Sequence, residues 1–341
     1  MSRPIILFDP HPRRSVDILD DATRSELWSL GEVVLHDDGP MPDDMVDRIL
    51  PHIEVLLGQT AMDAARLDLA PKLRGIVNVE TNFLPNIDYA ACFRRGIHVL
   101  TPGSAFAPPV AEIALGMAID LARGITSADR AFRQGQEKWG LEGNTGSFSL
   151  YGASIGLIGY GDLGRALHRL LAPFDCQVRV FDPWLPDYFL KKQGLEPCPL
   201  PNLLRTCQVI FVFAGVSSEN EGFIGSRQFE MMRPGSAFLL LSRAAVVDFP
   251  AMLEQAASGR LRVAIDVFPE EPVAATDPVR RNEGLLLSAH RAGALVDALH
   301  DIGRQAVADT SLMLRGLAPI VCRKAQRETV LRSRSKPIEK T

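Results

Sequence analysis

The chain has 341 residues, which is enough for two domains of ordinary size. Hydrophobic residues make up 46% of it and charged residues 23%, so the sequence can build packed cores. A net charge of −4 gives no electrostatic reason to expect a nucleic-acid partner. The five cysteines are scattered and form no CxxC pair, which favours reduced thiols in a cytoplasmic protein and indicates no metal site.

The first hundred residues alternate short apolar runs with helical patterns, as a parallel α/β sheet requires. The N-terminal run is broken by Asp9 and Pro10, so it is too short for a signal peptide or a membrane span, and we expect a soluble protein. Helices are predicted over 43–52 and 86–96, the second ending at Gly96 as a C-cap. Strands are predicted at 4–9, 32–36, 54–58, 74–79 and 97–100.

A second unit follows a long helix that is predicted over 108–135 and opens with prolines. A final helix over about 295–317 is expected to return to the first unit, and the basic residues 323–341 are predicted to form a flexible tail. Six strands with intervening helices are what a doubly wound dinucleotide-binding sheet needs. The six are predicted at 153–159, 177–182, 208–213, 236–242, 261–267 and 284–289.

A glycine-rich turn joins the strand 153–159 to a helix in the pattern GxGxxG. Gly159 permits the tight turn, Gly161 lets the backbone approach a pyrophosphate, and Gly164 lets the helix pack close to the strand. The next strand ends at Asp182, whose carboxylate suits a ribose diol and repels a 2′-phosphate, so NAD is predicted over NADP. The alternative is an ordinary tight turn with Asp182 as a strand cap. The predicted cofactor residues of the loop are Gly159, Tyr160, Gly161, Asp162, Leu163 and Gly164.

Chemically active side chains follow three successive strands of this sheet. Arg243 can pair with a substrate carboxylate and polarise a ketone, and His290 can exchange a proton at the hydroxyl oxygen. A carboxylate can orient that imidazole, but spacing alone does not choose between Glu270 and Glu271. Asp266, at the end of the strand 261–267, is included among the cofactor-binding residues. Each group taken singly also fits a surface ion pair, a polar strand end or a solvated loop.

The stretches LYGASIGLIGYGDLGRAL, LLSRAAVVD, AIDVFPEEP and SAHRAGAL together resemble the D-isomer-specific 2-hydroxyacid dehydrogenase family, over about residues 50–318. The resemblance selects Glu271 and implies that Arg243, Glu271 and His290 are catalytic. It implies hydride transfer between NAD and C2 of a 2-keto or 2-hydroxy acid, and a homodimer built around the nucleotide domains. It also implies two Rossmann-like or flavodoxin-like domains, with an NAD-binding domain (108–290) inserted into a discontinuous substrate domain (1–107 and 291–322).

The stretch VNVETNFLPNID, residues 77–88, departs from the glycine-containing loop of that family. In the family the backbone amides of this loop help to hold the substrate carboxylate, so the resemblance implies a pocket lip here. The alternative is a polar turn capped by Pro85. An inward-pointing Glu80, and the absence of an arginine from 58–60, argue against a phosphorylated or dicarboxylic substrate. The predicted substrate-binding residues are Val79, Glu80, Thr81, Asn82 and Arg243.

Other functions compete with a D-2-hydroxyacid dehydrogenase. Formate dehydrogenases of this fold have glutamine where Glu271 stands, which speaks against them. Phosphite dehydrogenase shares the arginine, glutamate and histidine, and so do NAD(H)-sensing corepressors, which bind partner proteins. A scaffold role is more distant. The prediction is therefore an NAD-dependent enzyme acting on a non-phosphorylated 2-keto or 2-hydroxy acid, with no membrane partner.

Overall fold

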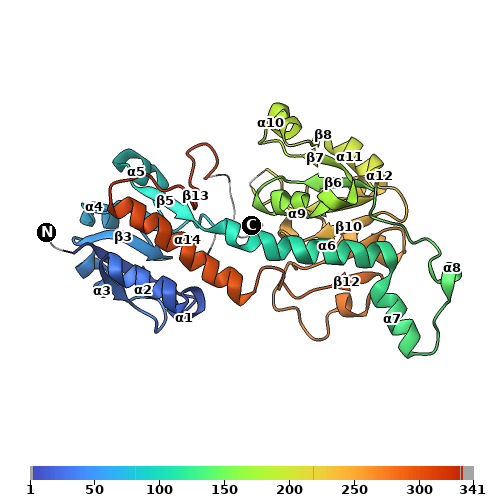
Figure 1. Cartoon of the computed structure of the whole chain (residues 1–341), viewed down its shortest axis with the longest axis horizontal. Coiled ribbons are helices and arrows are strands. Elements are labelled where there is room, and N and C mark those ends of the chain that lie inside the picture. Colours follow the sequence, from blue (N-terminus) through green and yellow to red (C-terminus); the bar gives the residue numbers. More distant parts are fainter. Residues whose placement is uncertain (1–2, 81, 218, 331, 333–341) are drawn as a thin grey trace. The chain divides into compact units, whose positions relative to one another are not determined.

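The computed structural model describes residues 3–80, 82–217, 219–330 and 332. The chain divides into two compact units. The first unit comprises Met1–Phe106 and Ala294–Thr341, and the second unit comprises Ala107–Gly293. Each unit contains a mainly parallel sheet with helices (Figure 1), so the predicted α/β fold class is confirmed.

The first unit has six strands in the order β13-β5-β4-β3-β1-β2. The five strands from β1 to β5 are parallel, and the order 2-1-3-4-5 is the flavodoxin-like arrangement. The topological switch point lies between β1 and β3, where such sheets bind ligands beyond their carboxyl ends. The strands are β1 (Ile5–Asp9), β2 (Glu32–Leu35), β3 (Ile53–Gly58), β4 (Gly75–Val77) and β5 (His98–Thr101).

Successive residues of these strands face opposite sides of the sheet, and each side is packed. In β1, Leu7 belongs to one core cluster, while Ile6 and Phe8 belong to the other. In β4 the same alternation separates Ile76 from Val77. The helices of this unit are α1 (Ser15–Ile18), α2 (Asp21–Leu30), α3 (Asp43–Ile49), α4 (Ala64–Leu69), α5 (Tyr89–Arg95) and α14 (Val296–Leu314). Gly96 ends α5 in the left-handed conformation (φ 70°), as predicted.

The C-terminal segment returns to the first unit, where α14 contacts α1, α2 and β3. The prediction of a tail that is flexible from residue 323 onward is wrong for the residues up to 330. Arg323–Lys324 form β13, antiparallel to β5, and the side chain of Val330 is 5% exposed and packs in a core cluster. The remainder of the predicted tail, residues 331 and 333–341, lies outside the described residues.

The second unit has a seven-stranded parallel sheet in the order β12-β11-β10-β9-β6-β7-β8. Its switch point lies between β6 and β9, and the glycine loop follows β6. Six of its strands are those predicted from the apolar runs. The strands are β6 (Ser154–Ile158), β7 (Gln177–Phe181), β8 (Glu196–Pro197), β9 (Val209–Val212), β10 (Ala237–Leu240), β11 (Arg262–Ile265) and β12 (Leu285–Leu287).

The helix predicted over 108–135 is divided in two. It begins as α6 (Ala107–Arg123), and Gly124 interrupts it with a φ of 66° before α7 (Ile125–Arg133). The segment Gly103–Arg123 has the length and apolarity of a membrane span, with a mean hydropathy of 1.4, but half of it is buried inside the structure. Helix α6 contacts β10, β11 and α9. It therefore has the environment of a core helix.

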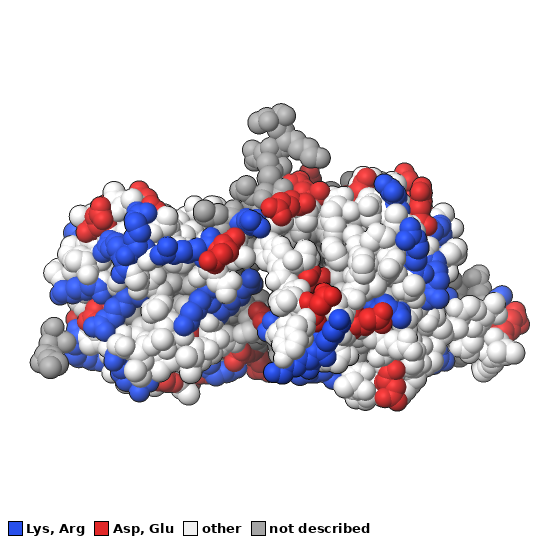
Figure 2. All heavy atoms as spheres, turned by 90° about the horizontal axis from the view of Figure 1, so that it is seen from above, with Lys and Arg blue, Asp and Glu red and all other residues white. Residues whose placement is uncertain are grey.

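The other helices of the second unit are short: α8 (Gly140–Gly143), α9 (Asp162–Leu171), α10 (Asp187–Lys192), α11 (Leu200–Thr206), α12 (Ser226–Met231) and α13 (Phe249–Ala257). Apolar residues from β9, β10 and β11 pack with those of α11 and α13 in one core cluster. On the molecular face in Figure 2, acidic and basic side chains are interspersed, as expected for a chain with a net charge of −4.

Candidate active site

The glycine loop leaves β6 and enters α9 with each glycine in a different environment. Gly159 has a φ of 94°, and a Cβ atom there would lie 2.8 Å from the backbone nitrogen of Ala214, which follows β9 closely. A Cβ on Gly164 would lie 2.8 Å from the carbonyl oxygen of Gly159, so only glycine lets α9 pack this close to the strand. A Cβ on Gly161 would meet nothing within 4 Å.

The open space at Gly161 is where a phosphate can approach the backbone. The N-terminus of α9 begins at Asp162, and its free N–H groups and helix dipole favour an anion there. Thus one glycine serves the turn, one serves packing, and one leaves room for a ligand. The residues present fit the pyrophosphate of a dinucleotide.

Asp182 immediately follows β7 and is half-buried. Its Oδ2 accepts the backbone N–H of Tyr160 at 2.9 Å, and its Oδ1 accepts the backbone N–H of Trp184 at 3.0 Å. These bonds fix the carboxylate beside the glycine loop, and each oxygen keeps a lone pair for a ribose hydroxyl. Asp182 thus caps the strand and still suits a ribose, so the two interpretations are compatible.

Tyr160 has a partner that the sequence pattern did not reveal. Its ring is 3% exposed, and its hydroxyl lies 3.0 Å from Nδ1 of His168, two turns along α9. Burial lowers the pKa of His168 and raises the pKa of Tyr160. Because the contact joins the loop to the helix that it opens, it stiffens the predicted cofactor site. The spacing of eight residues was the available signal.

His290 and Glu271 are brought together from two loops of the second unit. Nδ1 of His290 lies 2.6 Å from Oε2 of Glu271, while Oε1 of Glu271 accepts the backbone N–H of Phe268 at 2.8 Å. Glu270 takes no part in this contact. His290 has a φ of 48°, a left-handed conformation that non-glycine residues adopt at some cost. Its Nε2 remains available to a substrate.

Arg243 follows β10 and is half-buried. Burial lowers the pKa of its guanidinium, and the Glu271 carboxylate opposes that shift, so the two groups share one electrostatic environment. The Nη1 atom donates to the carbonyl of Ser242 at 2.7 Å. Ala244, which begins a short 3₁₀ turn, does not have a positive φ, so this position does not require glycine.

Asp266 holds the backbone of the histidine loop. Its side chain is 1% exposed, and its carboxylate accepts N–H groups of Arg291 at 3.1 Å and of Ala292 at 3.2 Å. Its carbonyl oxygen accepts the N–H of His290 at 2.7 Å, and Ser288 also donates to the carboxylate. This network keeps His290 in its left-handed conformation.

The predicted pocket lip lies in the first unit, after β4. The backbone amides that the family resemblance assigns to the substrate carboxylate already have side-chain partners at Val79 and Glu80. The N–H of Val79 donates to Oε1 of Gln59 at 3.2 Å, and the N–H of Glu80 donates to Oδ1 of Asn78 at 2.9 Å. Thr81 lies outside the described residues, and Asn82 contacts the carbonyl of Glu80 at 3.5 Å.

Glu80 is also paired with a residue that the sequence analysis did not single out. Nε of Arg13 lies 2.7 Å from Oε1 of Glu80, and both side chains are about three-quarters buried. The guanidinium of Arg13 also lies 5.9 Å from the centre of the Phe106 ring. Arg13 comes from the loop after β1, and its position just beyond a predicted strand was a signal in the sequence.

Comparison with known proteins connects these features to one family. The pattern described as "D-isomer specific 2-hydroxyacid dehydrogenase, NAD binding domain" matches residues 115–292, which include the glycine loop, Arg243, Glu271 and His290. The chain belongs to the D-isomer specific 2-hydroxyacid dehydrogenase family. It is therefore an NAD-dependent oxidoreductase, and its cofactor is NAD.

Individual relatives of this dehydrogenase cover nearly its whole length. The crystal structure of a phosphoglycerate oxidoreductase from Rhizobium etli is 45% identical, with the match covering 96% of this chain and 100% of that one and a TM-score of 0.87. A glyoxylate reductase of Korarchaeum cryptofilum is 26% identical, covering 83% of this chain and 84% of the relative. A hydroxypyruvate reductase of Thermotoga maritima is 26% identical, covering 85% and 94%.

Proposed function

We propose that this dehydrogenase interconverts a non-phosphorylated 2-keto acid and the corresponding D-2-hydroxy acid. The observation that carries the proposal is the contact of 2.6 Å between His290 and Glu271, which provides a positioned proton donor and acceptor. Arg243 supplies a nearby fixed cation for the substrate carboxylate, and the family supplies the reaction class.

Each residue has a distinct task in the proposed mechanism. NADH, when bound, supplies the hydride and its electron pair to C2 of the keto acid. Arg243 pairs with the carboxylate, and protonated His290 donates its Nε2 proton to the carbonyl oxygen as the negative charge develops there. Glu271 holds Nδ1 and stabilises the imidazolium. In the reverse direction, neutral His290 accepts the hydroxyl proton.

The cofactor-binding residues are proposed on the geometry of the second unit. The loop residues 159–164 accommodate the pyrophosphate, and Asp182 accepts the ribose hydroxyls. Asp266 is proposed to act at the nicotinamide end, since it lies beside His290 and fixes its loop. Val79, Glu80, Thr81 and Asn82 are proposed to contact the substrate, together with Arg243.

The non-phosphorylated substrate is proposed from the charges after β3 and β4. Both ends of the Gln59 amide are engaged, with Nε2 donating to the carbonyl of His11 at 3.1 Å and Oε1 accepting from Val79. Glu80 adds a carboxylate to the same edge of the sheet. A phosphate dianion would find no arginine at position 59, and to reach Arg13 it would have to displace the Glu80 carboxylate, which repels it. The Rhizobium etli relative is named a phosphoglycerate oxidoreductase, so a phosphorylated keto acid is the decisive comparison.

The test is NADH oxidation by the purified protein with glyoxylate, hydroxypyruvate, pyruvate and 3-phosphohydroxypyruvate. We expect the highest kcat/KM on a non-phosphorylated acid. A preference for 3-phosphohydroxypyruvate would overturn the substrate assignment. NAD⁺ reduction with phosphite, in the absence of keto-acid turnover, would instead favour a phosphite dehydrogenase-like enzyme.

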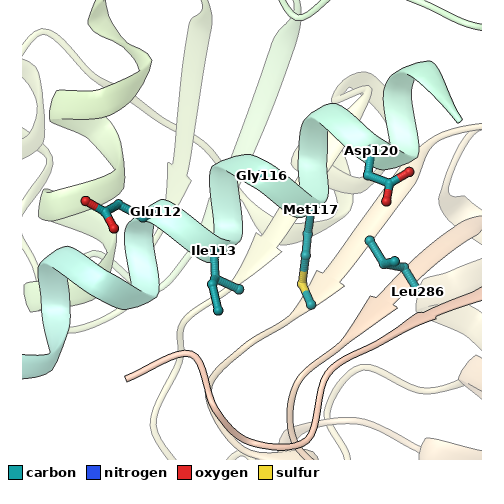
Figure 3. Close-up of a pocket in the computed structure, with 6 residues that line it drawn as sticks. All are labelled: Glu112, Ile113, Gly116, Met117, Asp120 and Leu286. Atoms are coloured by element: carbon teal, nitrogen blue, oxygen red, sulfur yellow. The ribbon is translucent and has the colours of Figure 1, made fainter. Parts of the chain in front are cut away.

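We further propose that the enzyme is a homodimer formed through its nucleotide-binding unit. Ile125, Phe132, Trp139 and Leu141 carry large apolar side chains that are 54–89% exposed, all on the segment that follows α6. Beside α6 lies a shallow groove of about 410 Å³, lined in part by Ile113, Met117 and Leu286 (Figure 3). A second copy of this chain would cover both.

Sedimentation equilibrium tests the dimer. We expect twice the chain mass for the wild type and a weaker association for Trp139→Ser, because the indole is 74% exposed and supplies apolar contact area. A monomer at about 10 µM protein would contradict the proposal, since obligate interfaces commonly persist at that concentration. A cytoplasmic location is proposed because all five cysteines are free thiols.

A further inference from the structure

Three of the buried polar atoms that have no hydrogen-bond partner among the described residues belong to Arg13, Glu80 and Asn78. They are Nε of Arg13, Oε1 of Glu80 and Nδ2 of Asn78. The first two approach to 2.7 Å as an ion pair, but without the angles of a hydrogen bond. Buried polar atoms are normally hydrogen-bonded, so an ion pair without hydrogen-bond geometry, next to an amide whose Nδ2 is unbonded, points to a ligand site.

The three atoms lie at one edge of the first unit's sheet. Arg13 follows β1, whereas Asn78 and Glu80 follow β4, and the Oδ1 atom of Asn78 accepts the N–H of Glu80 at 2.9 Å. That bond turns the free Nδ2 of Asn78, whose side chain is 1% exposed, away from Glu80 N. Strands β1 and β3 flank the switch point, at whose carboxyl end such sheets bind ligands.

These three atoms also differ from an ordinary anion-binding site, which presents hydrogen-bond donors alone. Nε and Nδ2 are donors, and Oε1 is an acceptor. The backbone amides of Val79 and Glu80, which would add donors, are already bonded to side chains. A ligand that satisfies this set must therefore both donate and accept hydrogen bonds.

We propose that Arg13, Glu80 and Asn78 form a recognition site for hydroxyl groups on the tail of the substrate. A hydroxyl oxygen accepts a hydrogen bond from Arg13 or Asn78, and its O–H donates a hydrogen bond to the carboxylate of Glu80. The inference rests on the proposed 2-keto acid reductase function and deepens it. It assigns a specificity role to Arg13 and Asn78, which the sequence patterns left without one.

The ion pair explains why a hydroxyl fits better than either of two alternatives. A phosphate offers acceptors only, so it would leave Oε1 of Glu80 unmatched and place like charges together. An alkyl tail would leave Nδ2 of Asn78 without a partner and would offer no hydrogen bond to the ion pair. Sites built to bond a hydroxyl discriminate strongly against substrates that lack it, because the polar groups are then left unpaired.

The experiment measures kcat/KM with NADH for hydroxypyruvate, pyruvate and 3-phosphohydroxypyruvate, and uses ratios within each variant. Ratios cancel any general loss of activity. In the wild type we expect hydroxypyruvate to exceed pyruvate by about 10² or more. Arg13→Met should lower that ratio at least tenfold. Glu80→Gln should raise the ratio of 3-phosphohydroxypyruvate to hydroxypyruvate at least tenfold, because it removes the opposing carboxylate and releases Arg13.

A matched control is the ion pair of Arg74, just before β4, and Glu54, within β3. Its Nε and Oε2 atoms are 3.0 Å apart. Arg74→Met and Glu54→Gln should leave both ratios unchanged. If Arg13→Met does not fold, Asn78→Asp supplies the test. Aspartate keeps an oxygen to accept the N–H of Glu80 but replaces the Nδ2 donor with a second acceptor. The ratio of kcat/KM for hydroxypyruvate to that for pyruvate should fall.

The kinetics distinguish an error in the hydroxyl site from an error in the proposed reductase function. Turnover of keto acids with ratios that do not change in Arg13→Met, Glu80→Gln and Asn78→Asp would overturn the hydroxyl site and leave the reductase function standing. No turnover of any keto acid by the wild type, glyoxylate included, would overturn the proposed function itself. Glyoxylate makes this distinction because it has no tail.

Discussion

The Nδ1 atom of His290 lies 2.6 Å from Oε2 of Glu271, and the other oxygen of that carboxylate is held by the backbone N–H of Phe268. The carboxylate is thus fixed by its own loop before it contacts the imidazole. His290 in turn is held by Asp266 through its backbone. Glu271 thus orients the imidazole through Nδ1, and Asp266 fixes the backbone that carries it, so Nε2 is left for proton exchange.

The first prediction concerns this pair. His290→Ala should lower kcat by about 10²–10⁴-fold, the contribution of a general acid–base group, with little change in the Kd for NADH. Glu271→Gln should cost less, because an amide keeps an oxygen for the N–H of Phe268 but does not stabilise the imidazolium. Steady-state kinetics and NADH fluorescence titration measure both effects. Unchanged rates in His290→Ala would remove it from the mechanism.

The second prediction separates the three glycines of the loop. Gly161→Ala should weaken NADH binding at least tenfold while changing the free energy of unfolding by less than about 0.5 kcal/mol, because the new Cβ meets no protein atom and occupies ligand space. Gly164→Ala should lower that free energy by about 1–3 kcal/mol, since its Cβ meets the Gly159 carbonyl at 2.8 Å.

Urea denaturation and NADH titration provide the two readouts for these glycine variants. Each variant is the control for the other: Gly161→Ala should affect NADH binding and leave stability nearly unchanged, and Gly164→Ala should affect stability first. Equal losses of stability in both variants would show that Gly161 serves packing and not the cofactor.

The third prediction concerns the choice of NADH over NADPH. Asp182→Asn removes a negative charge and keeps one oxygen to accept an N–H from Tyr160 or Trp184. The ratio of kcat/KM for NADPH to that for NADH should rise at least tenfold, which corresponds to about 1.4 kcal/mol of relieved repulsion. A ratio equal to the wild-type value would mean that Asp182 acts as a strand cap and does not contact the ribose.

The fourth prediction concerns pH. Burial lowers the pKa of His168 below its usual 6.5, so the unfolded chain takes up this proton at a higher pH than the folded chain. The free energy of unfolding should therefore fall as pH decreases through 6.5 toward the folded pKa. His168→Asn keeps an acceptor for the Tyr160 hydroxyl but cannot titrate, and should show a shallower loss between pH 7.5 and 5.5.

His98 is half-buried and its pKa is also lowered by burial, so the informative quantity is the difference between the wild type and His168→Asn. Urea midpoints at the two pH values measure it. Parallel pH profiles for the two proteins would contradict the assignment to His168.

Much of the fold could be predicted because apolar runs mark buried parallel strands. The strands missed were β8 and β13, each of two residues, whose Glu-Pro and Arg-Lys sequences carry no apolar signal. The break in the long helix was missed at Gly124, because a single glycine within a periodic pattern does not by itself show whether the backbone turns left-handed.

The site divides in the same way. The glycine loop, Asp182, Arg243 and His290 could be proposed because each follows a strand, whereas Glu271 was chosen over Glu270 through the family resemblance alone. The pairing of Arg13 with Glu80 joins residues far apart in the sequence, and the bond of Gln59 to the N–H of Val79 depends on how three loops meet. No local pattern predicts such contacts, so the sequence did not reveal that the amides of Val79 and Glu80 bond to side chains.

The measurement that most directly tests the central claim follows the hydride itself. The enzyme is given hydroxypyruvate and NADH carrying deuterium at C4, on each face in turn, and the product is analysed by mass spectrometry and chiral chromatography. We expect D-glycerate with one deuterium at C2 from one of the two labelled cofactors. Tight binding of NADH with no deuterium in any product, or the L-isomer as product, would contradict it.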